Sequence, residues 1–286
     1  MNLNPIPNIL ALHDLATYGR CSLTCVIPVL STLGVKVCPL PTSVYSSDTG
    51  GFGPVYARDL TEEMPRILGK LETIPARIDS IYSGYLGEPK QVAFVEALLR
   101  KYKGLKIVDP VMGDSGKLYS AFNTEMVEKM RILCRCADLI TPNITEAAFL
   151  LRESVPAIMN DAEARNFGRR MFDAFGAKTV VTSVLLSSHP DSIFSLVCDG
   201  DSTQVVGVPD LTAHFPGTGD VFTSVLTGKL LQGKPLLSAV EAAAAFTTDT
   251  MEKTIQAGTP VREGLLLEAC LQNLSSIPNI TKTYTL

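Results

Sequence analysis

Apolar residues along this chain form two kinds of pattern that alternate from the N-terminus onward. Short apolar runs predict buried strands at 8–13, 35–38, 42–45, 76–83, 105–108, 138–141 and 178–183. Longer stretches with apolar residues at helical spacing predict helices at 22–33, 60–70, 90–103, 126–136, 147–151, 161–175, 236–252 and 262–272. Strands that alternate with helices are typical of an α/β domain with a mostly parallel sheet.

Two segments of alternating polarity in the second half of the chain predict an antiparallel hairpin. Residues 193–198 and 203–208 are joined by Asp-Gly-Asp-Ser, a sequence that favours a tight turn between strands. We expect this hairpin at the edge of the parallel sheet. The last residues, 273–286, are polar, and we expect them to fray. The sequence contains no repeat, low-complexity tract or linker, so we expect one domain over residues 1–286.

The most informative local motif is Gly217-Thr218-Gly219-Asp220, which leads directly into an apolar pattern at helical spacing. A glycine turn at the start of a helix leaves backbone N–H groups free to bind an anion, and the missing side chains let the anion come close. Asp220 falls in the first helical turn, where a carboxylate either caps the helix or accepts a proton from a hydroxyl held near the anion. The motif alone leaves both interpretations open.

Acidic residues follow several predicted strands, and ligands of parallel sheets bind at the C-terminal ends of strands. Asp14 follows the first strand, where it either stabilises the loop or contacts a ligand. Asp109 and Asp114 follow another strand, and paired carboxylates in this position suit a magnesium–phosphate site. Glu146 falls in the first turn of a helix after a Pro-Asn turn, so it is either a capping residue or a second acidic group at the same centre.

Two glycine-rich segments in the first half are candidates for substrate contacts. The run from Ser46 to Pro54 holds three glycines and a proline, so it cannot be helical and forms either a flap over a substrate or an ordinary connector. Tyr85 lies between glycines after the strand at 76–83. It either presents its ring and hydroxyl to a planar ligand or is simply packed.

Composition narrows the classes of function. The chain has 286 residues, 46% of them hydrophobic, a net charge of −4 and no basic tract, so nucleic acid is not an expected partner. No apolar run approaches the roughly 18 residues of a membrane helix, and the N-terminus lacks the pattern of a secretory signal. The seven cysteines are scattered, without a Cys-x-x-Cys pair, which favours free thiols in a cytoplasmic protein over disulfides or a zinc site.

Three motifs at strand ends, taken in order, are similar to those of the ribokinase-like superfamily of small-molecule kinases. They are Asp109-Pro-Val-Met-Gly-Asp114, Thr141-Pro-Asn-x-x-Glu146 and Gly217-Thr-Gly-Asp220, and the resemblance covers nearly the whole chain. The segment Ser83-Gly-Tyr-Leu-Gly87 narrows it to the vitamin B6 kinase branch, which comprises pyridoxal, pyridoxine and pyridoxamine kinases. The opening His13-Asp-Leu-x-x-Tyr-Gly-Arg-Cys-Ser22 resembles bacterial pyridoxamine kinases in particular.

The resemblance implies a Rossmann-like three-layer α/β/α sandwich, with an antiparallel edge hairpin on a mostly parallel sheet. It further implies a homodimer that uses ATP, Mg²⁺ and a monovalent cation such as K⁺ to phosphorylate the 5′-hydroxymethyl group of a B6 vitamer, in salvage of pyridoxal 5′-phosphate. Asp220 matches the base that deprotonates the alcohol. The other implied roles are an anion hole at Gly217, Thr218 and Gly219, ring contacts at Asp14, Tyr45, Thr49 and Tyr85, nucleotide contacts at Asp109, Asn143, Glu146, Thr182, Ser183 and Gly219, and metal contacts at Asp109, Asp114, Thr141 and Glu146.

The resemblance leaves two other functions open. A hydroxymethylpyrimidine (phosphate) kinase of thiamine synthesis shares the catalytic centre and differs around the ring, where Tyr85 favours a B6 vitamer. A non-catalytic vitamer or nucleotide carrier is disfavoured, because it has no need of Asp220 as a base. One departure bears on specificity: many relatives carry serine at the position of Asp14. We hypothesise that aspartate there favours a cationic pyridinium or the amine of pyridoxamine.

Overall fold

The structure is a computed structural model that describes residues 6–75, 77–200, 202–277 and 280–286. Its strands are β1 (Asn8–Ala16), β2 (Lys36–Tyr45), β3 (Ala57–Asp59), β4 (Ser80–Ser83), β5 (Leu105–Val108), β6 (Gly113–Asp114), β7 (Lys117–Leu118), β8 (Leu139–Ile140), β9 (Lys178–Leu185), β10 (Ser192–Asp199), β11 (Ser202–Pro209) and β12 (Lys282–Thr285). Its α-helices are α1 (Leu23–Thr32), α2 (Glu63–Leu71), α3 (Pro89–Lys101), α4 (Thr124–Cys134), α5 (Ile144–Leu151), α6 (Asp161–Phe175), α7 (Thr218–Leu231) and α8 (Leu236–Ala257).

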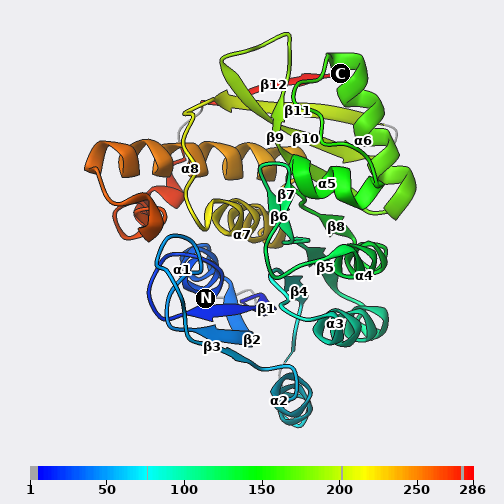
Figure 1. Cartoon of the computed structure of the whole chain (residues 1–286), viewed down its shortest axis with the longest axis vertical. Coiled ribbons are helices and arrows are strands. Elements are labelled where there is room, and N and C mark those ends of the chain that lie inside the picture. Colours follow the sequence, from blue (N-terminus) through cyan, green and yellow to red (C-terminus); the bar gives the residue numbers. More distant parts are fainter. Residues whose placement is uncertain (1–5, 76, 201, 278–279) are drawn as a thin grey trace, which may run out of the picture.

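The main sheet runs in the order β12-β11-β10-β9-β8-β5-β4-β1-β2-β3 (Figure 1). The strands from β2 to β9 in this order are parallel. The remaining strands pair antiparallel, with β3 at one edge and the β10–β11 hairpin and β12 at the other. The expected mostly parallel sheet with an antiparallel hairpin is therefore confirmed.

Helices cover both faces of the sheet, which makes the three layers that were expected. On one face lie α1, α7 and α8, whose residues Val29, Val225 and Phe246 are fully buried in one core (Figure 1). On the other face α3 to α6 enclose a second core that includes Val95 and Met130. Two apolar cores of this size hold the strand ends rigidly in place, and the loops after the strands carry the polar residues.

The connections between strands reverse direction at the end of β1. The chain goes from β1 to its neighbour β2 on one side and then returns to pair β4 on the other side. The connections after β1 and β4 therefore leave in opposite directions. Ligands of open α/β sheets bind at the C-terminal ends of the strands at such a reversal, and this place is called the crevice below. His13 and Asp14 lie at that end of β1, and Gly84 and Tyr85 follow β4.

Three sequence-based expectations differ from the structure. The segment expected as a helix at 262–272 consists of 3₁₀ turns at Val261–Glu263, Leu267–Ala269 and Leu271–Ser275. Gly264 interrupts any helix there with a φ of 74°, and a Cβ at this glycine would lie 2.8 Å from the carbonyl oxygen of Arg20. The two short strands expected around Pro39 and Pro41 are one strand, β2, because the missing proline N–H groups are tolerated near a sheet edge.

The C-terminal tail is the third correction. Residues 282–285 form β12, which pairs antiparallel with β11, instead of fraying. Tyr284 packs edge-on against Phe194 and near His189, so the polar tail carries one aromatic anchor. The expected strand at 76–83 begins only at Ser80, and its first residue, Ala76, lies outside the described residues, as do 278–279 of the tail.

Candidate active site

The glycine turn Gly217-Thr218-Gly219, which the sequence predicts to be catalytic and which is called the catalytic turn below, forms the start of α7. Gly217 is the N-cap residue with a φ of 80°, and no side chain caps the helix there. A Cβ at Gly217 would lie 2.1 Å from the carbonyl oxygen of Arg20, so both its φ and its surroundings require glycine. The first turn of α7 thus presents backbone N–H groups and the positive end of the helix dipole at the sheet crevice.

Asp220 lies in this first turn and does not cap its own helix. Its Oδ2 accepts a hydrogen bond of 2.7 Å from the backbone N–H of Ser22. Burial is the main cause that raises the pKa of Asp220 to about 7, and Asp14 and Asp48 add to the effect as neighbouring negative charges. A carboxylate with a pKa near neutrality is suited to accept a proton.

Asp14 is linked to Asp220 through one residue. The hydroxyl of Ser22 donates a short hydrogen bond to Asp14 Oδ1, while the backbone N–H of the same serine binds Asp220. Ser22 is the N-cap residue of α1 and takes a φ of 48° with a ψ of −129°, which side-chain-bearing residues rarely adopt. Burial raises the pKa of Asp14 to about 6, against the opposing effect of the Ser22 hydroxyl. The loop-stabilising interpretation of Asp14 therefore holds, and its carboxylate still borders the crevice.

A second acidic group lies at the ends of β5 and β8. Asp109 is buried, and its Oδ2 lies 3.3 Å from the hydroxyl oxygen of Thr223 on α7. The same hydroxyl lies 3.2 Å from Thr141 Oγ1. Burial raises the pKa of Asp109 well above its usual range, and the neighbouring charges of Glu146 and Asp220 raise it further. Carboxylates gathered in this way are stabilised when a cation binds among them.

Glu146 is a capping residue, which confirms one of the two interpretations. Asn143 and Glu146 form a reciprocal capping box at the start of α5, with both hydrogen bonds 2.9 Å long. The other oxygen of Glu146 accepts from the backbone N–H of Met112 at 3.0 Å, which ties this helix to the loop after β5. Burial raises the pKa of Glu146 to about 8.

Asp114 is placed differently from its expected partners. It is exposed in the β6–β7 hairpin, where it accepts a hydrogen bond from the backbone N–H of Ser115. Within the described part of the chain, no three His, Cys, Asp or Glu side chains are arranged to hold a metal ion. Asp109 and Glu146 are thus buried, whereas Asp114 is exposed to solvent.

The residues expected around a planar ring lie beside the crevice. The hydroxyls of Tyr45 and Tyr85 are 3.4 Å apart, and the ring of Tyr85 packs 5.5 Å from that of Phe122. Thr42 donates from its hydroxyl to the backbone carbonyl of Tyr85. Tyr85 is therefore half-buried and packed against Phe122 and Tyr45. Thr49 is exposed in the loop that follows β2.

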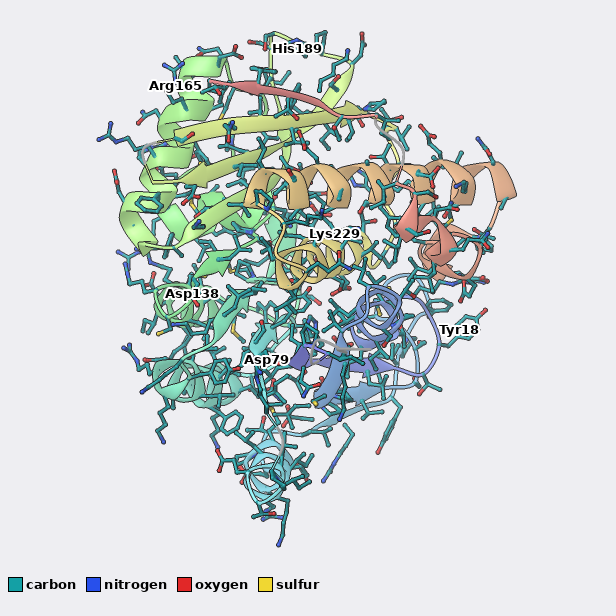
Figure 2. The ribbon with its side chains drawn as sticks, turned by 180° about the vertical axis from the view of Figure 1, so that it is seen from behind. Tyr18, Asp79, Asp138, Arg165, His189 and Lys229 are labelled. Atoms are coloured by element: carbon teal, nitrogen blue, oxygen red, sulfur yellow. The ribbon has the colours of Figure 1, made fainter. Side chains whose placement is uncertain are left out.

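The glycine-rich loop after β2 lies next to the residue before the catalytic turn, since a Cβ at Gly50 would lie 3.8 Å from Pro216 Cγ. Its Asp48 donates from the backbone N–H to the carbonyl of Tyr18 at 2.8 Å. The ring of Phe52 contacts Tyr18 edge-on at 5.5 Å, and the guanidinium carbon of Arg262 lies 5.3 Å from the Phe52 ring centre. Figure 2 shows Tyr18 on the opposite side of the view from Asp138, which precedes β8. The loop follows β2 and contacts the segment that follows β1, so it lies at the C-terminal ends of these two strands.

Strand β9 is irregular at Thr182 and Ser183, two of the residues expected to contact the nucleotide. Thr182 and Ser183 lie in β9 where its register with β10 shifts, and Ser183 is exposed with a φ of 62°. Two residues of β9 oppose one residue of β10, which is a β-bulge. Thr182 also bridges to Asn143, and this contact joins the ends of β8 and β9.

Three residues of the site were missed by sequence reasoning. Ser22 joins Asp14 to Asp220, Thr223 joins Asp109 to Thr141, and the buried His13 lies with its Nδ1 3.8 Å from Asp220 Oδ1. His13 and Ser22 begin and end the N-terminal motif that resembles pyridoxamine kinases, but the sequence predicted no role for either. Thr223 lies one helical turn after the catalytic turn, a spacing that could have placed it on the same face as Gly219.

The parallel sheet, the glycine turn at the start of α7 and the buried carboxylates together define a small-molecule kinase of the ribokinase-like class. A family model described as phosphomethylpyrimidine kinase matches residues 27–263. The chain belongs to this family. No helix in the described ranges combines the length and apolar character needed to cross a membrane.

Solved structures and curated relatives cover almost the whole chain. A Bacteroides thetaiotaomicron protein provisionally called a phosphomethylpyrimidine kinase is 40% identical, with full coverage of both chains and a TM-score of 0.92. A second crystal form of it, described as containing pyridoxal, has a TM-score of 0.91 over 98% of this chain and 100% of that one. The pyridoxal kinase of Lactobacillus plantarum is 30% identical over 94% and 96% of the two chains, with a TM-score of 0.87.

Among curated proteins, a pyridoxine/pyridoxal/pyridoxamine kinase of Bordetella bronchiseptica is 29% identical over 273 residues, which is 90% of this chain and 93% of that protein. These relatives confirm the resemblance to the vitamin B6 kinase branch that the strand-end motifs indicated.

Proposed function

We propose that this chain is an ATP-dependent kinase that phosphorylates the 5′-hydroxymethyl group of a vitamin B6 vitamer, in salvage of pyridoxal 5′-phosphate. The observation that carries the proposal is Asp220, a buried carboxylate in the first turn of α7 that Ser22 links to Asp14 at the strand crevice. Pyridoxal kinases among the relatives, and a 40% identical neighbour crystallised with pyridoxal, support a B6 vitamer as the substrate.

Asp220 is the general base in this proposal. Its Oδ2 is held by the Ser22 N–H, so the carboxylate has a fixed orientation toward the crevice. A pKa of about 7 leaves a large fraction ionised at neutral pH and makes the carboxylate a good acceptor for the proton of an alcohol. The oxygen of that alcohol then forms the new bond to the terminal phosphorus of ATP, and ADP leaves.

The amides at the start of α7 have the complementary role. Phosphoryl transfer depends on positioning and charge neutralisation more than on covalent chemistry. Gly217, Thr218 and Gly219 present backbone N–H groups and the helix dipole, which offset negative charge on the group in transfer. The loop from Ser46 to Pro54 excludes water from this centre, and the bulge at Thr182–Ser183 borders the nucleotide.

The buried acidic residues fit Mg²⁺. The charged neighbours that shift the pKa of Asp109 are Glu146 and Asp220, both negative, and Asp109 is almost fully buried. Asp109 and Glu146 would hold the ion through water, with Thr141 beside them and Asp114 at the rim, and the ion would supply charge neutralisation to the phosphates. A monovalent cation such as K⁺ would lie near Thr141 and Thr182.

Further parts of the proposal concern assembly and location. The seven cysteines are all free thiols, which supports action in the reducing cytoplasm. A homodimer is the expected assembly, and sedimentation of the purified chain tests it. An active chain that sediments only as a monomer would contradict that part.

The alternative substrate is hydroxymethylpyrimidine or its phosphate, which the description of the matching family favours. The paired rings of Tyr45 and Tyr85 beside the carboxylates favour a B6 vitamer. Purified protein with ATP and Mg²⁺ should be given pyridoxal, pyridoxamine, pyridoxine and hydroxymethylpyrimidine in parallel, with phosphorylated product followed by mass. We expect phosphorylated B6 vitamers. Product from the pyrimidine alone would support the alternative, and ATP binding without any product would indicate a carrier.

A further inference from the structure

His13 is a buried polar side chain that has no role in the mechanism above. It lies at the end of β1 with 0% of its surface exposed, and neither of its ring nitrogens has a hydrogen-bond partner among the residues that the structure describes. Buried polar atoms in proteins are paired in the great majority of cases. An unpaired imidazole at this depth indicates a partner within reach of a small side-chain rotation.

The geometry identifies that partner. His13 Nδ1 lies 3.8 Å from Asp220 Oδ1, just beyond hydrogen-bond distance, so a small rotation of either side chain closes the gap. The other oxygen of Asp220 is already bound to the N–H of Ser22. Because each carboxylate oxygen accepts more than one hydrogen bond, Oδ1 can bind His13 and still face a substrate hydroxyl.

The surrounding residues fix the imidazole in this place. The ring of Tyr82 packs against it edge-on with centres 4.3 Å apart. On another side lies Gly84, where a Cβ would be 2.1 Å from His13 Cε1, so only glycine leaves room for the ring. The glycine after β4 therefore has a specific function in accommodating His13.

The protonation state of His13 makes it a donor that favours one form of Asp220. Burial lowers the pKa of His13 to about 3, so the ring is neutral and carries one N–H. An ionised carboxylate only accepts hydrogen bonds, whereas a protonated one also needs an acceptor for its own O–H. A donor at Oδ1 consequently stabilises the ionised form, which is the form a general base requires.

We propose that His13 is a positioning residue for Asp220, donating from Nδ1 to Asp220 Oδ1 so that the base is aimed at the substrate site and kept ionised. This inference rests on the proposed function for its role in turnover, although its effect on Asp220 is independent of any substrate.

Other titratable groups also act on Asp220 and must stay constant in a test. They come from every element packed around it: Asp14, Cys21, Cys25, Asp48, Tyr82, Asp109 and Tyr119. A comparison of variants at position 13 alone leaves this set unchanged. Asparagine and leucine form the matched pair, because they have nearly the same shape and only asparagine carries an N–H close to the position of histidine Nδ1.

The decisive experiment follows the titration of Asp220 by carbon NMR in protein labelled at aspartate carboxyls, without nucleotide or metal, with Asp220→Asn used for assignment. We expect H13L to raise the titration midpoint by about one pH unit, the effect of losing a tenfold preference for the ionised form. We expect H13N to stay within half that shift of the wild type. Equal midpoints in H13L and H13N, whether shifted or not, would overturn the proposal.

Kinetics supply the second readout. In H13L the acidic limb of kcat/KM for the vitamer should move to higher pH by the same amount as the NMR midpoint, with the KM for ATP unchanged, and H13N should restore it. A wild-type chain without kinase activity would refute the proposed function, while the NMR titration would still decide the role of His13. If H13L fails to fold, H13Q replaces it, because the glutamine N–H lies at the position of histidine Nε2 and cannot reach Asp220 Oδ1. H13Q should then show the raised midpoint expected of H13L. A wild-type midpoint in H13Q would overturn the proposal.

Discussion

The two glycines of the catalytic turn allow the anion-binding role to be separated from folding. Gly217 has a φ of 80°, and a Cβ there would lie 2.1 Å from a backbone carbonyl oxygen, which cannot move without shifting the chain. Gly219 has ordinary helical geometry, and no atom of the described residues lies within 4 Å of a Cβ built on it. The perturbations to compare are therefore G217A and G219A.

Their expected effects on stability differ in sign. In G217A the left-handed backbone costs about 1–2 kcal/mol, and the clash adds at least a similar amount, so we expect a loss of about 2–4 kcal/mol in the free energy of unfolding. In G219A the gain in helix propensity is about 0.5–1 kcal/mol, so we expect equal or higher stability. Urea unfolding of the chain without ligands measures both values, provided that the slope with denaturant stays constant.

Their expected effects on activity are alike. The methyl group of G219A occupies space through which a phosphoryl group approaches the amides of α7, so we expect kcat/KM to fall about 10²-fold although the fold is intact. Product formation with ATP, Mg²⁺ and pyridoxal provides the assay. A stable G219A variant with wild-type kcat/KM would refute the reasoning that these amides contact the transferred group.

Three further outcomes follow from the site. Because Asp220 must be ionised to act as a base and its pKa is raised to about 7, kcat/KM should be half-maximal near pH 7 and level off about one unit higher; a flat profile down to pH 5 would exclude this role. R262A removes the guanidinium over Phe52, so it should raise the KM for the vitamer about 2–5-fold and increase vitamer-independent ATP hydrolysis. The control R135A loses a similar contact with Phe175 far from the site and should change neither quantity. D14S should lower the preference for pyridoxamine over pyridoxal in kcat/KM, and an unchanged ratio would count against the charge of Asp14 as its cause.

Much of the fold and part of the site could be predicted because they depend on local sequence. The alternating strands and helices, and the glycine turn before Asp220, follow from patterns within a few residues. The link from Asp14 through Ser22 to Asp220 joins positions 8 and 198 residues apart, so no local pattern encodes it. The same reason explains β12, whose pairing depends on the free edge of β11, and the broken helix after Val261, where Gly264 lies against the backbone of Arg20.

The separate environments of Asp114 and Glu146 were also beyond sequence reasoning. Both carboxylates follow predicted strands, and their residue types suit the same metal centre. The structure buries Glu146 in a capping box and leaves Asp114 exposed in the β6–β7 hairpin. Which of two equivalent carboxylates is buried depends on the packing of α5 against the loop after β5, which involves residues more than 30 positions apart.

The variant Asp220→Asn tests the central claim, because its stability and its activity should change in opposite directions. The folded chain holds a proton on Asp220 up to about pH 7, whereas the unfolded chain loses it near pH 4, so this residue lowers stability as pH rises between those values. Asparagine has no charge to bury and can still accept from Ser22. We therefore expect Asp220→Asn to be about 2–4 kcal/mol more stable than the wild type at pH 8.

The most direct measurement is the rate at which wild type and Asp220→Asn form phosphorylated vitamer from ATP, Mg²⁺ and pyridoxal at pH 8. The account predicts product with the wild type and a rate about 10²–10⁴-fold lower with the variant, with ATP binding unchanged. Near-normal turnover by Asp220→Asn would contradict it.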